Sequence, residues 1–75
     1  MTKEEFENLT FRKVSHVSMF DSHSILYVND DTGLRFQVDI RKLKNGDFGK
    51  ERKTYCWQGK WYSEKQFINN ILDTI

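Results

Sequence analysis

His16, His23 and Cys56 carry the side chains of this 75-residue chain that are best suited to metal binding or nucleophilic chemistry. A structural zinc site takes four ligands, and the spacing of the two histidines matches no standard zinc knuckle. A cysteine nucleophile works with a base and a third group that orients the base, and no third group is identifiable here. The sequence therefore predicts no metal, no cofactor and no catalytic residue.

The triplet Asp31-Thr32-Gly33 is the one that bears the catalytic carboxylate in retroviral-type aspartic proteases. That chemistry needs two carboxylates that share a proton in a dry site at the end of an apolar strand. Here the triplet follows the polar pair Asn29-Asp30, and the chain is too short for such a barrel. Asn, Asp and Gly in succession are typical of a turn, so we interpret residues 29–33 as a turn between two strands.

The stretch RKLKNGDFGKERK, residues 41–53, carries six basic and two acidic side chains around an Asn-Gly pair. Its composition predicts a basic hairpin, and its charges can steer an anionic partner. One reading is a protein-binding arm with an apolar anchor, another is a nucleic-acid-binding arm, and the third is an ordinary solvated hairpin. We favour a protein partner and keep nucleic acid as the alternative. The predicted contact residues are Arg41, Lys44, Phe48, Lys50, Arg52 and Trp61.

Aromatic residues are concentrated in TYCWQGKWYS, residues 54–63. If Gln58-Gly59 reverses the chain, Tyr55, Trp57 and Tyr62 share the buried side of a sheet, whereas Trp61 lies on its wet side. If the stretch runs straight as one strand, Trp61 is buried and Tyr62 faces outward. We favour the hairpin. An exposed Trp61 would be typical of a binding anchor or of partial cover for a sheet edge.

The remaining pattern predicts the elements that position these side chains. Thr2 with Glu5 and Ser63 with Gln66 are capping-box pairs, so we expect a helix to begin at each site. In residues 10–20 apolar side chains recur at every third position, which is a helical spacing, but the β-branched content favours a strand, and we predict a strand. Residues 25–28 are predicted to be a strand that is buried on both faces or nearly so. Residues 34–41 alternate between apolar and polar side chains, as a strand with one wet face does. Phe67, Ile68, Ile71, Leu72 and Ile75 form the apolar stripe of a terminal helix.

These elements predict an α+β fold in a single domain, residues 1–75. Its antiparallel sheet of four or five strands would be a meander, with a short N-terminal helix and a C-terminal amphipathic helix packed on one sheet face. We expect Asn45-Gly46 to form a two-residue type I′ hairpin turn, with Asp39 opposite Arg52 and Phe36 opposite Tyr55. Gly49 marks the place where that register is most apt to slip.

Composition narrows the class of protein. Residues 1–40 hold four basic and seven acidic side chains, whereas residues 41–65 hold eight basic and three acidic, so the second region is electropositive. So small a domain has little room for both a core and a cleft, which argues against an enzyme. One cysteine, no apolar run of membrane-spanning length and an acidic N-terminus predict a cytoplasmic protein that does not contact a membrane. We therefore expect a small interaction module, such as a regulator or an inhibitor, and keep a homodimer as an alternative because unpaired sheet edges often associate.

Overall fold

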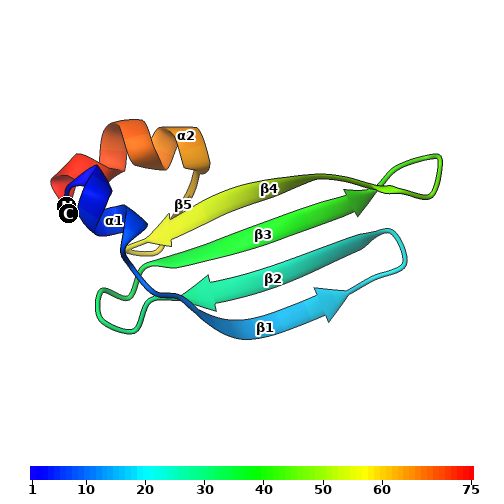
Figure 1. The fold of residues 1–75 in the computed structure, drawn as a ribbon, viewed down its shortest axis with the longest axis horizontal. Helices are drawn as coiled ribbons and strands as arrows, with labels where there is room; N and C mark the ends of the chain where they lie inside the picture. Colours follow the sequence, from blue (N-terminus) through cyan, green and yellow to red (C-terminus); the bar gives the residue numbers. More distant parts are fainter.

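A computed structural model describes residues 1–75, which form one five-stranded antiparallel sheet with short helices at one end (Figure 1). The strands follow one another in chain order across the sheet, as predicted for a meander. They are β1 (Arg12–Ser18), β2 (Ser22–Val28), β3 (Arg35–Lys42), β4 (Phe48–Trp57) and β5 (Lys60–Ser63). The predicted α+β fold, including the strand in the first twenty residues, is confirmed.

Both helical segments begin where the sequence predicts. α1 (Lys3–Glu7) starts after Thr2, and α2 (Glu64–Gln66) starts after Ser63, each with a complete capping box. Beyond α2 the helix continues as a π-helical turn, η1 (Phe67–Ile71), and ends in a 3-10 turn, η2 (Leu72–Thr74). Neither helical segment combines the length and the apolar character that a membrane-spanning helix needs.

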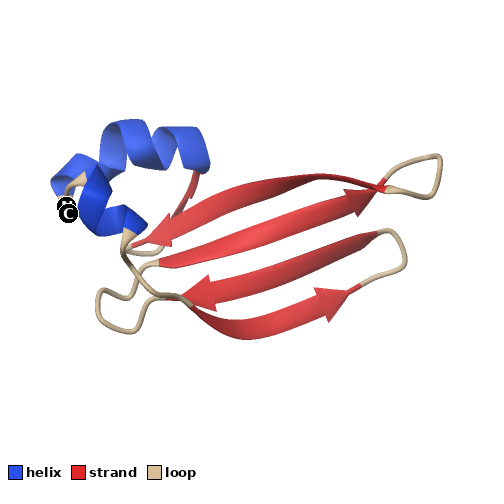
Figure 2. Cartoon of the chain, in the orientation of Figure 1, coloured by secondary structure: helices blue, strands red, loops and turns tan.

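The core is small and lies under these helices, at one end of the sheet (Figure 2). Leu34, Tyr55, Phe67 and Leu72 form its centre, and only six of the 75 residues are buried in all. The rings of Tyr55 and Phe67 stack with centroids 4.8 Å apart and so join β4 to the terminal helix. The predicted apolar stripe of that helix is confirmed, since Ile68, Ile71 and Ile75 pack against the same cluster.

The rest of the sheet is a single layer. The molecule measures 41 Å along its longest axis, and the strands extend well past the helices (Figure 1). Beyond the helices nothing covers either face, so every residue of β2 is half-buried and every residue of β1 is exposed. The prediction that residues 25–28 are buried on both faces is therefore wrong.

Two of the hairpins differ in how they turn. Gln58 and Gly59 both have positive φ, 50° and 80°, which is the type I′ geometry, and Trp57 pairs with Lys60 across them. The predicted type I′ turn at Asn45-Gly46 is wrong, because Asn45 does not have positive φ. The amide of Gly46 donates instead to the carbonyl of Leu43, and the Asn45 side chain accepts from the amide of Asp47 at 3.0 Å. The bond from the Asp47 amide to the Asn45 side chain favours a loop that is longer than a two-residue turn.

The predicted register between β3 and β4 holds in the body of the hairpin. Phe36 pairs with Tyr55 and Asp39 with Arg52. The register then shifts between Ile40 and Lys42, so that Lys42 pairs with Phe48. A β-carbon on Gly49 would lie 3.3 Å from the carbonyl oxygen of Arg41, a tight contact that disfavours a side chain at this bulge. The slip at Gly49 is as predicted.

Candidate functional site

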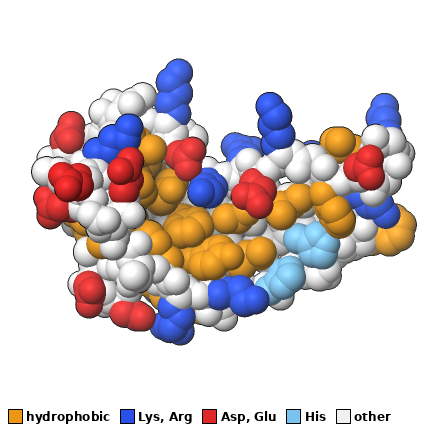
Figure 3. Space-filling model, in the orientation of Figure 1, with side chains coloured by type: hydrophobic (Ala, Val, Ile, Leu, Met, Phe, Trp, Pro, Cys, Tyr) orange, Lys and Arg blue, Asp and Glu red, His pale blue; other side chains and the backbone are white.

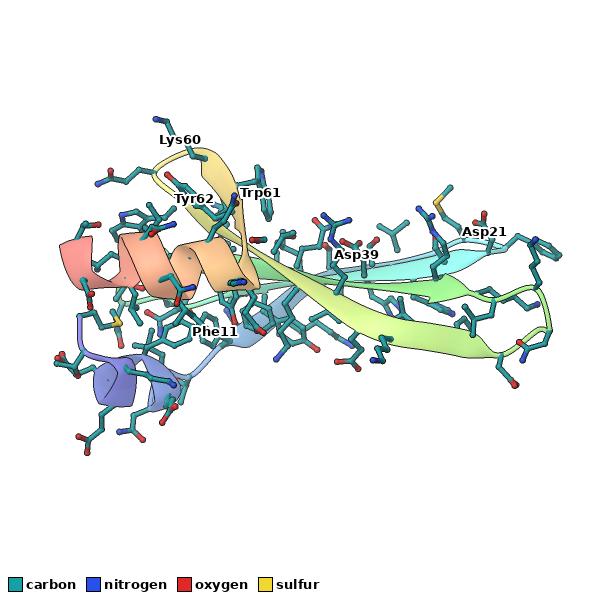
Figure 4. All side chains as sticks on the ribbon, turned by 90° about the horizontal axis from the view of Figure 1, so that it is seen from above. Phe11, Asp21, Asp39, Lys60, Trp61 and Tyr62 are labelled. Carbon is teal, nitrogen blue, oxygen red and sulfur yellow. The ribbon has the colours of Figure 1, made fainter.

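The two faces of the sheet carry different side chains. We call the side under the helices the helix face; it includes Phe36, Val38 and Tyr55. The opposite side, the open face, has no helix over it, and its residues on β3 and β4 include Gln37, Asp39, Arg52, Thr54 and Cys56. Figure 4 shows Asp39 and Trp61 on the side of the sheet opposite to Phe11, whose ring contacts Phe36. The open face is the surface on which a partner meets the fewest covering elements.

Three of the predicted contact residues converge on the open face. Arg41, Lys50 and Arg52 line one hollow of about 380 Å³ at the end of the sheet far from the helices. All three side chains are exposed. The only ion pair between side chains joins Arg12 to Asp30, so none of the three cations forms one, although the Asp39 carboxylate lines the same hollow. Cations without partners in an open hollow are suited to hold an anionic group.

Polar groups complete that hollow. Ser22, Ser24 and Asp39 also line it. The Ser24 hydroxyl donates to Asp39 Oδ1 at 2.6 Å, and Gln37 Nε2 donates to the same oxygen at 2.9 Å. These bonds hold the Asp39 carboxylate against the sheet. Asp39 lies opposite Arg52 in the ladder, but its hydrogen bonds go to Ser24 and Gln37. The hollow therefore has a cationic rim and one internally bonded carboxylate.

Val14, Val17, Leu26 and Val28 lie beside the hollow on the same face, and we call them the apolar strip. A second hollow of about 250 Å³ is lined by Val17 and Leu26 together with Ser15, Ser24 and Gln37. A third, of about 270 Å³, is lined by Val14, Leu26 and Val28 with charged neighbours. Val14 and Val17 are about half exposed, at 49% and 54%. The hollow of Val17 shares Ser24 with the cationic hollow, whereas Val14 lies beside the Arg12–Asp30 pair, so the face has a mixed apolar and charged character.

Trp61 lies on the open face, nearer the helices. It pairs with Cys56, which pairs with Arg35 on the next strand, so these three side chains form a row across β3, β4 and β5. The predicted hairpin at Gln58-Gly59 is confirmed, and the Trp61 side chain is 52% exposed. Tyr62 is half-buried and packs against the core, as the hairpin reading predicts.

Phe48 and Lys44 do not join the other predicted residues. The bulge at Gly49 turns Phe48 onto the helix face, where its ring lies 5.0 Å from that of His23. Lys44 is exposed in the turn between β3 and β4. Phe48 is 53% exposed, but it faces away from the hollow that Arg41, Lys50 and Arg52 line. The six predicted residues thus divide between two faces and a loop.

The candidates for chemistry are also separated. His16 and His23 contact each other on the helix face, whereas Cys56 lies on the open face. No group of three or more histidine, cysteine or carboxylate side chains comes together. Asp31 lies exposed in a turn that the buried side chain of Asn29 organises by accepting from the amide and the hydroxyl of Thr32. The interpretation of residues 29–33 as a turn is confirmed.

Two contacts shift the pKa of an ionisable side chain: the Arg12–Asp30 ion pair, which lines the third hollow of the open face, and the contact of Tyr55 with Glu64 beside the core. Arg12 donates two hydrogen bonds to Asp30, at 3.0 and 3.2 Å, and these bonds lower the pKa of the exposed Asp30 carboxyl. Burial, together with the charge of Glu64, raises the pKa of Tyr55 to about 12. The Tyr55 hydroxyl donates to Glu64 Oε2 at 3.4 Å.

The apolar strip is the part of this surface that sequence reasoning missed. Residues 25–28 form a continuous apolar run, which is typical of a strand that other layers cover on both faces. The available signal was the length of the terminal helix. Its eleven residues, 64–74, span about 16 Å, which is too short to cover a sheet that extends through most of a 41 Å molecule.

In comparisons with protein families, curated proteins and solved structures, nothing matches this chain.

Proposed function

We propose that this chain is a small non-enzymatic interaction module that binds a protein partner through the open face of its sheet and the adjoining basic hairpin. The observation that carries the proposal is the convergence of Arg41, Lys50 and Arg52, without ion-pair partners, beside a weakly covered apolar strip. Isolated exposed apolar residues are ordinary, but an apolar strip that is rimmed by charge on an uncovered face is typical of an interaction surface.

The chemistry of this face suggests the chemistry of its partner. The hollow near Arg52 favours a carboxylate, since arginine can hold one through two parallel hydrogen bonds. Val17 and Leu26, next to it, favour an apolar side chain. We therefore propose a protein segment in which acidic and apolar residues adjoin. The unpaired cations would speed the encounter with such a segment, and the apolar contacts would hold it.

Trp61 would be the anchor at the other end of the face. Trp61 lies opposite Cys56, which is four residues along β4 from Arg52. At the rise of an extended strand, Cys56 and Arg52 are about 13 Å apart. A partner segment of several residues could span that distance. Tryptophan and arginine are the residues that most often dominate the binding energy of an interface.

Nucleic acid is the second candidate, and the three unpaired cations favour it. Binding of single strands generally combines such cations with several aromatic platforms. The large aromatic on the open face is Trp61, a single platform, and Val17 and Leu26 beside the hollow suit an apolar side chain rather than a phosphate. These features favour a protein over a nucleic acid.

A peptide-display selection against the immobilised chain tests the proposal directly. We expect enrichment of peptides that combine acidic and apolar residues, and loss of their binding in the Trp61→Ala variant and in the Lys50→Gln/Arg52→Gln variant. Fluorescence anisotropy with a labelled oligonucleotide at low salt tests the alternative. Tight, steeply salt-dependent oligonucleotide binding without any peptide enrichment would replace the protein proposal with the nucleic-acid one.

The proposal also includes a cytoplasmic setting and a role as a regulator or an inhibitor. The single cysteine fits a reducing compartment, where an unpaired thiol persists. A binding role without catalysis fits the small core, which leaves no room for an enclosed substrate cleft.

A further inference from the structure

The two histidines of the chain lie side by side on the helix face. His16 is on β1 and His23 on β2, and His16 Nε2 lies 3.4 Å from His23 Nδ1. This separation is at the long end for an N–H···N hydrogen bond, which usually measures about 3 Å. The pair lies on the half of the sheet that the helices leave bare. Figure 3 shows the two imidazoles adjoining each other there, at the margin of the apolar side chains.

A β-bulge brings the pair together. Lys13 pairs with Tyr27, but the register then shifts so that Ser15 pairs with Leu26 and His16 with Ile25. Without that shift His16 would pair with Ser24 and lie on the open face, because successive residues of a strand alternate between faces. Bulges often re-aim a side chain at a functional site.

The distance between the two nitrogens matches a shared metal ligand set. Zinc binds histidine nitrogens at about 2.0–2.1 Å in tetrahedral geometry, and two such bonds place the nitrogens about 3.3–3.4 Å apart. We propose that His16 Nε2 and His23 Nδ1 form a two-histidine binding site for a zinc-class divalent cation. This site is separate from the open face and goes beyond the proposed binding of a protein partner.

Water would supply the remaining ligands, since no third histidine, cysteine or carboxylate side chain joins the pair. Imidazole ligands suit zinc, copper and nickel and exclude calcium and magnesium, which take oxygen ligands. The Phe48 ring packs against His23 and limits its freedom to turn away. The protein would therefore supply two of the four ligands of a tetrahedral ion, and the site is open to solvent.

Coordination at this site would link β1 to β2. β1 is an edge strand whose seven residues are all exposed, so it has the least support from packing of any strand. A metal that bridges His16 to His23 would bind the folded hairpin more tightly than the unfolded chain, and it would therefore raise the midpoint of thermal unfolding.

Zinc titration of the full chain at pH 7.5, followed by calorimetry and by two-dimensional NMR, tests this proposal. We expect one zinc per chain, with spectral changes concentrated around residues 16 and 23. We expect His16→Gln and His23→Gln each to weaken zinc binding at least about tenfold, because a single imidazole remains. We expect zinc to raise the unfolding midpoint of the parent chain but not that of either variant.

Two controls make the test specific. Cys56→Ser should bind zinc as the parent chain does, since Cys56 lies on the other face. The double variant His16→Val/Val17→His keeps both histidines but places one on the open face, so it should lose zinc binding. Circular dichroism without metal establishes that each variant is folded. Absence of zinc binding up to millimolar concentration, equal binding by His16→Gln, or loss of binding in Cys56→Ser would overturn the proposal.

Discussion

Trp61 lies directly opposite Cys56 in the ladder between β4 and β5, which places its indole on the face of the sheet that carries no helix. Tyr62, one residue later, packs into the core. The aromatic stretch from Tyr55 to Tyr62 therefore serves two purposes: most of its rings hold the terminal helix on the sheet, and one is left for solvent or a partner. Predictions about stability and about binding separate along this division.

Phe67→Ala and Trp61→Ala should differ sharply in stability. Phe67 is fully buried, and its removal leaves a cavity that should cost about 3–5 kcal/mol of unfolding free energy. Trp61 is 52% exposed, so its truncation should cost no more than about 1 kcal/mol. Chemical denaturation of both variants measures the difference. A large loss of stability in Trp61→Ala would mean that its role is structural.

Gln58→Asn should stabilise the chain. Gln58 has a φ of 50°, which asparagine adopts more readily than glutamine, and Asn-Gly is the preferred pair of a type I′ turn. We expect a gain of about 0.5 kcal/mol and a higher midpoint of thermal unfolding. The matched change Asn45→Gln should not be stabilising, because Asn45 has no positive φ and its side chain bonds the amide of Asp47. A lower midpoint for Gln58→Asn would contradict the turn assignment.

Tyr55 should make the fold sensitive to alkaline pH. Burial raises the pKa of its hydroxyl to about 12, against 10.0 for the ordinary side chain. As pH rises from 10, the unfolded chain loses this proton before the folded chain does, so the stability that the shift contributes declines and is lost as pH passes 12. Denaturation at pH 8 and at pH 11 measures the decline, and Tyr55→Phe should show a smaller one. An equal decline in both proteins would show that other groups cause it.

Much of the fold was predictable because its signals are local. The capping residues Thr2 and Ser63, the alternation of residues 34–41 and the Gln58-Gly59 reversal each depend on a few neighbouring side chains. The exposure of β2 was not predictable in this way, because burial depends on how far the terminal helix reaches over the sheet. The continuous apolar run of residues 25–28 misled the interpretation for that reason.

The candidate site was predictable only in part, since bulges decide which face a side chain occupies. Alternation alone would place Phe48 on the open face with Arg52, but the bulge at Gly49 moves it to the helix face. The bulge near Val14 likewise brings His16 beside His23, and no glycine or proline in the sequence marks it. A shift of one residue in the register therefore decides whether two side chains lie on the same face of the sheet or on opposite faces.

Charge on the two faces of the basic hairpin should have unequal effects on partner binding. Lys50 and Arg52 line the open-face hollow, whereas Lys42 and Lys53 lie on the helix face, near the rings of Phe20 and Phe36. Lys50→Gln/Arg52→Gln and Lys42→Gln/Lys53→Gln remove the same charge from the same hairpin. Any general electrostatic attraction should therefore weaken equally in both variants. Binding at a local site on the open face should weaken only in the first variant.

The most direct test of the proposed function is the affinity of one selected acidic and apolar peptide for these two double variants, measured by calorimetry at physiological salt. The proposal predicts at least about a tenfold loss of affinity in Lys50→Gln/Arg52→Gln, as expected when charge-assisted hydrogen bonds are lost, and less than about threefold in Lys42→Gln/Lys53→Gln. Equal losses in the two variants, or the larger loss in the helix-face variant, would contradict the assignment of the open face as the binding surface.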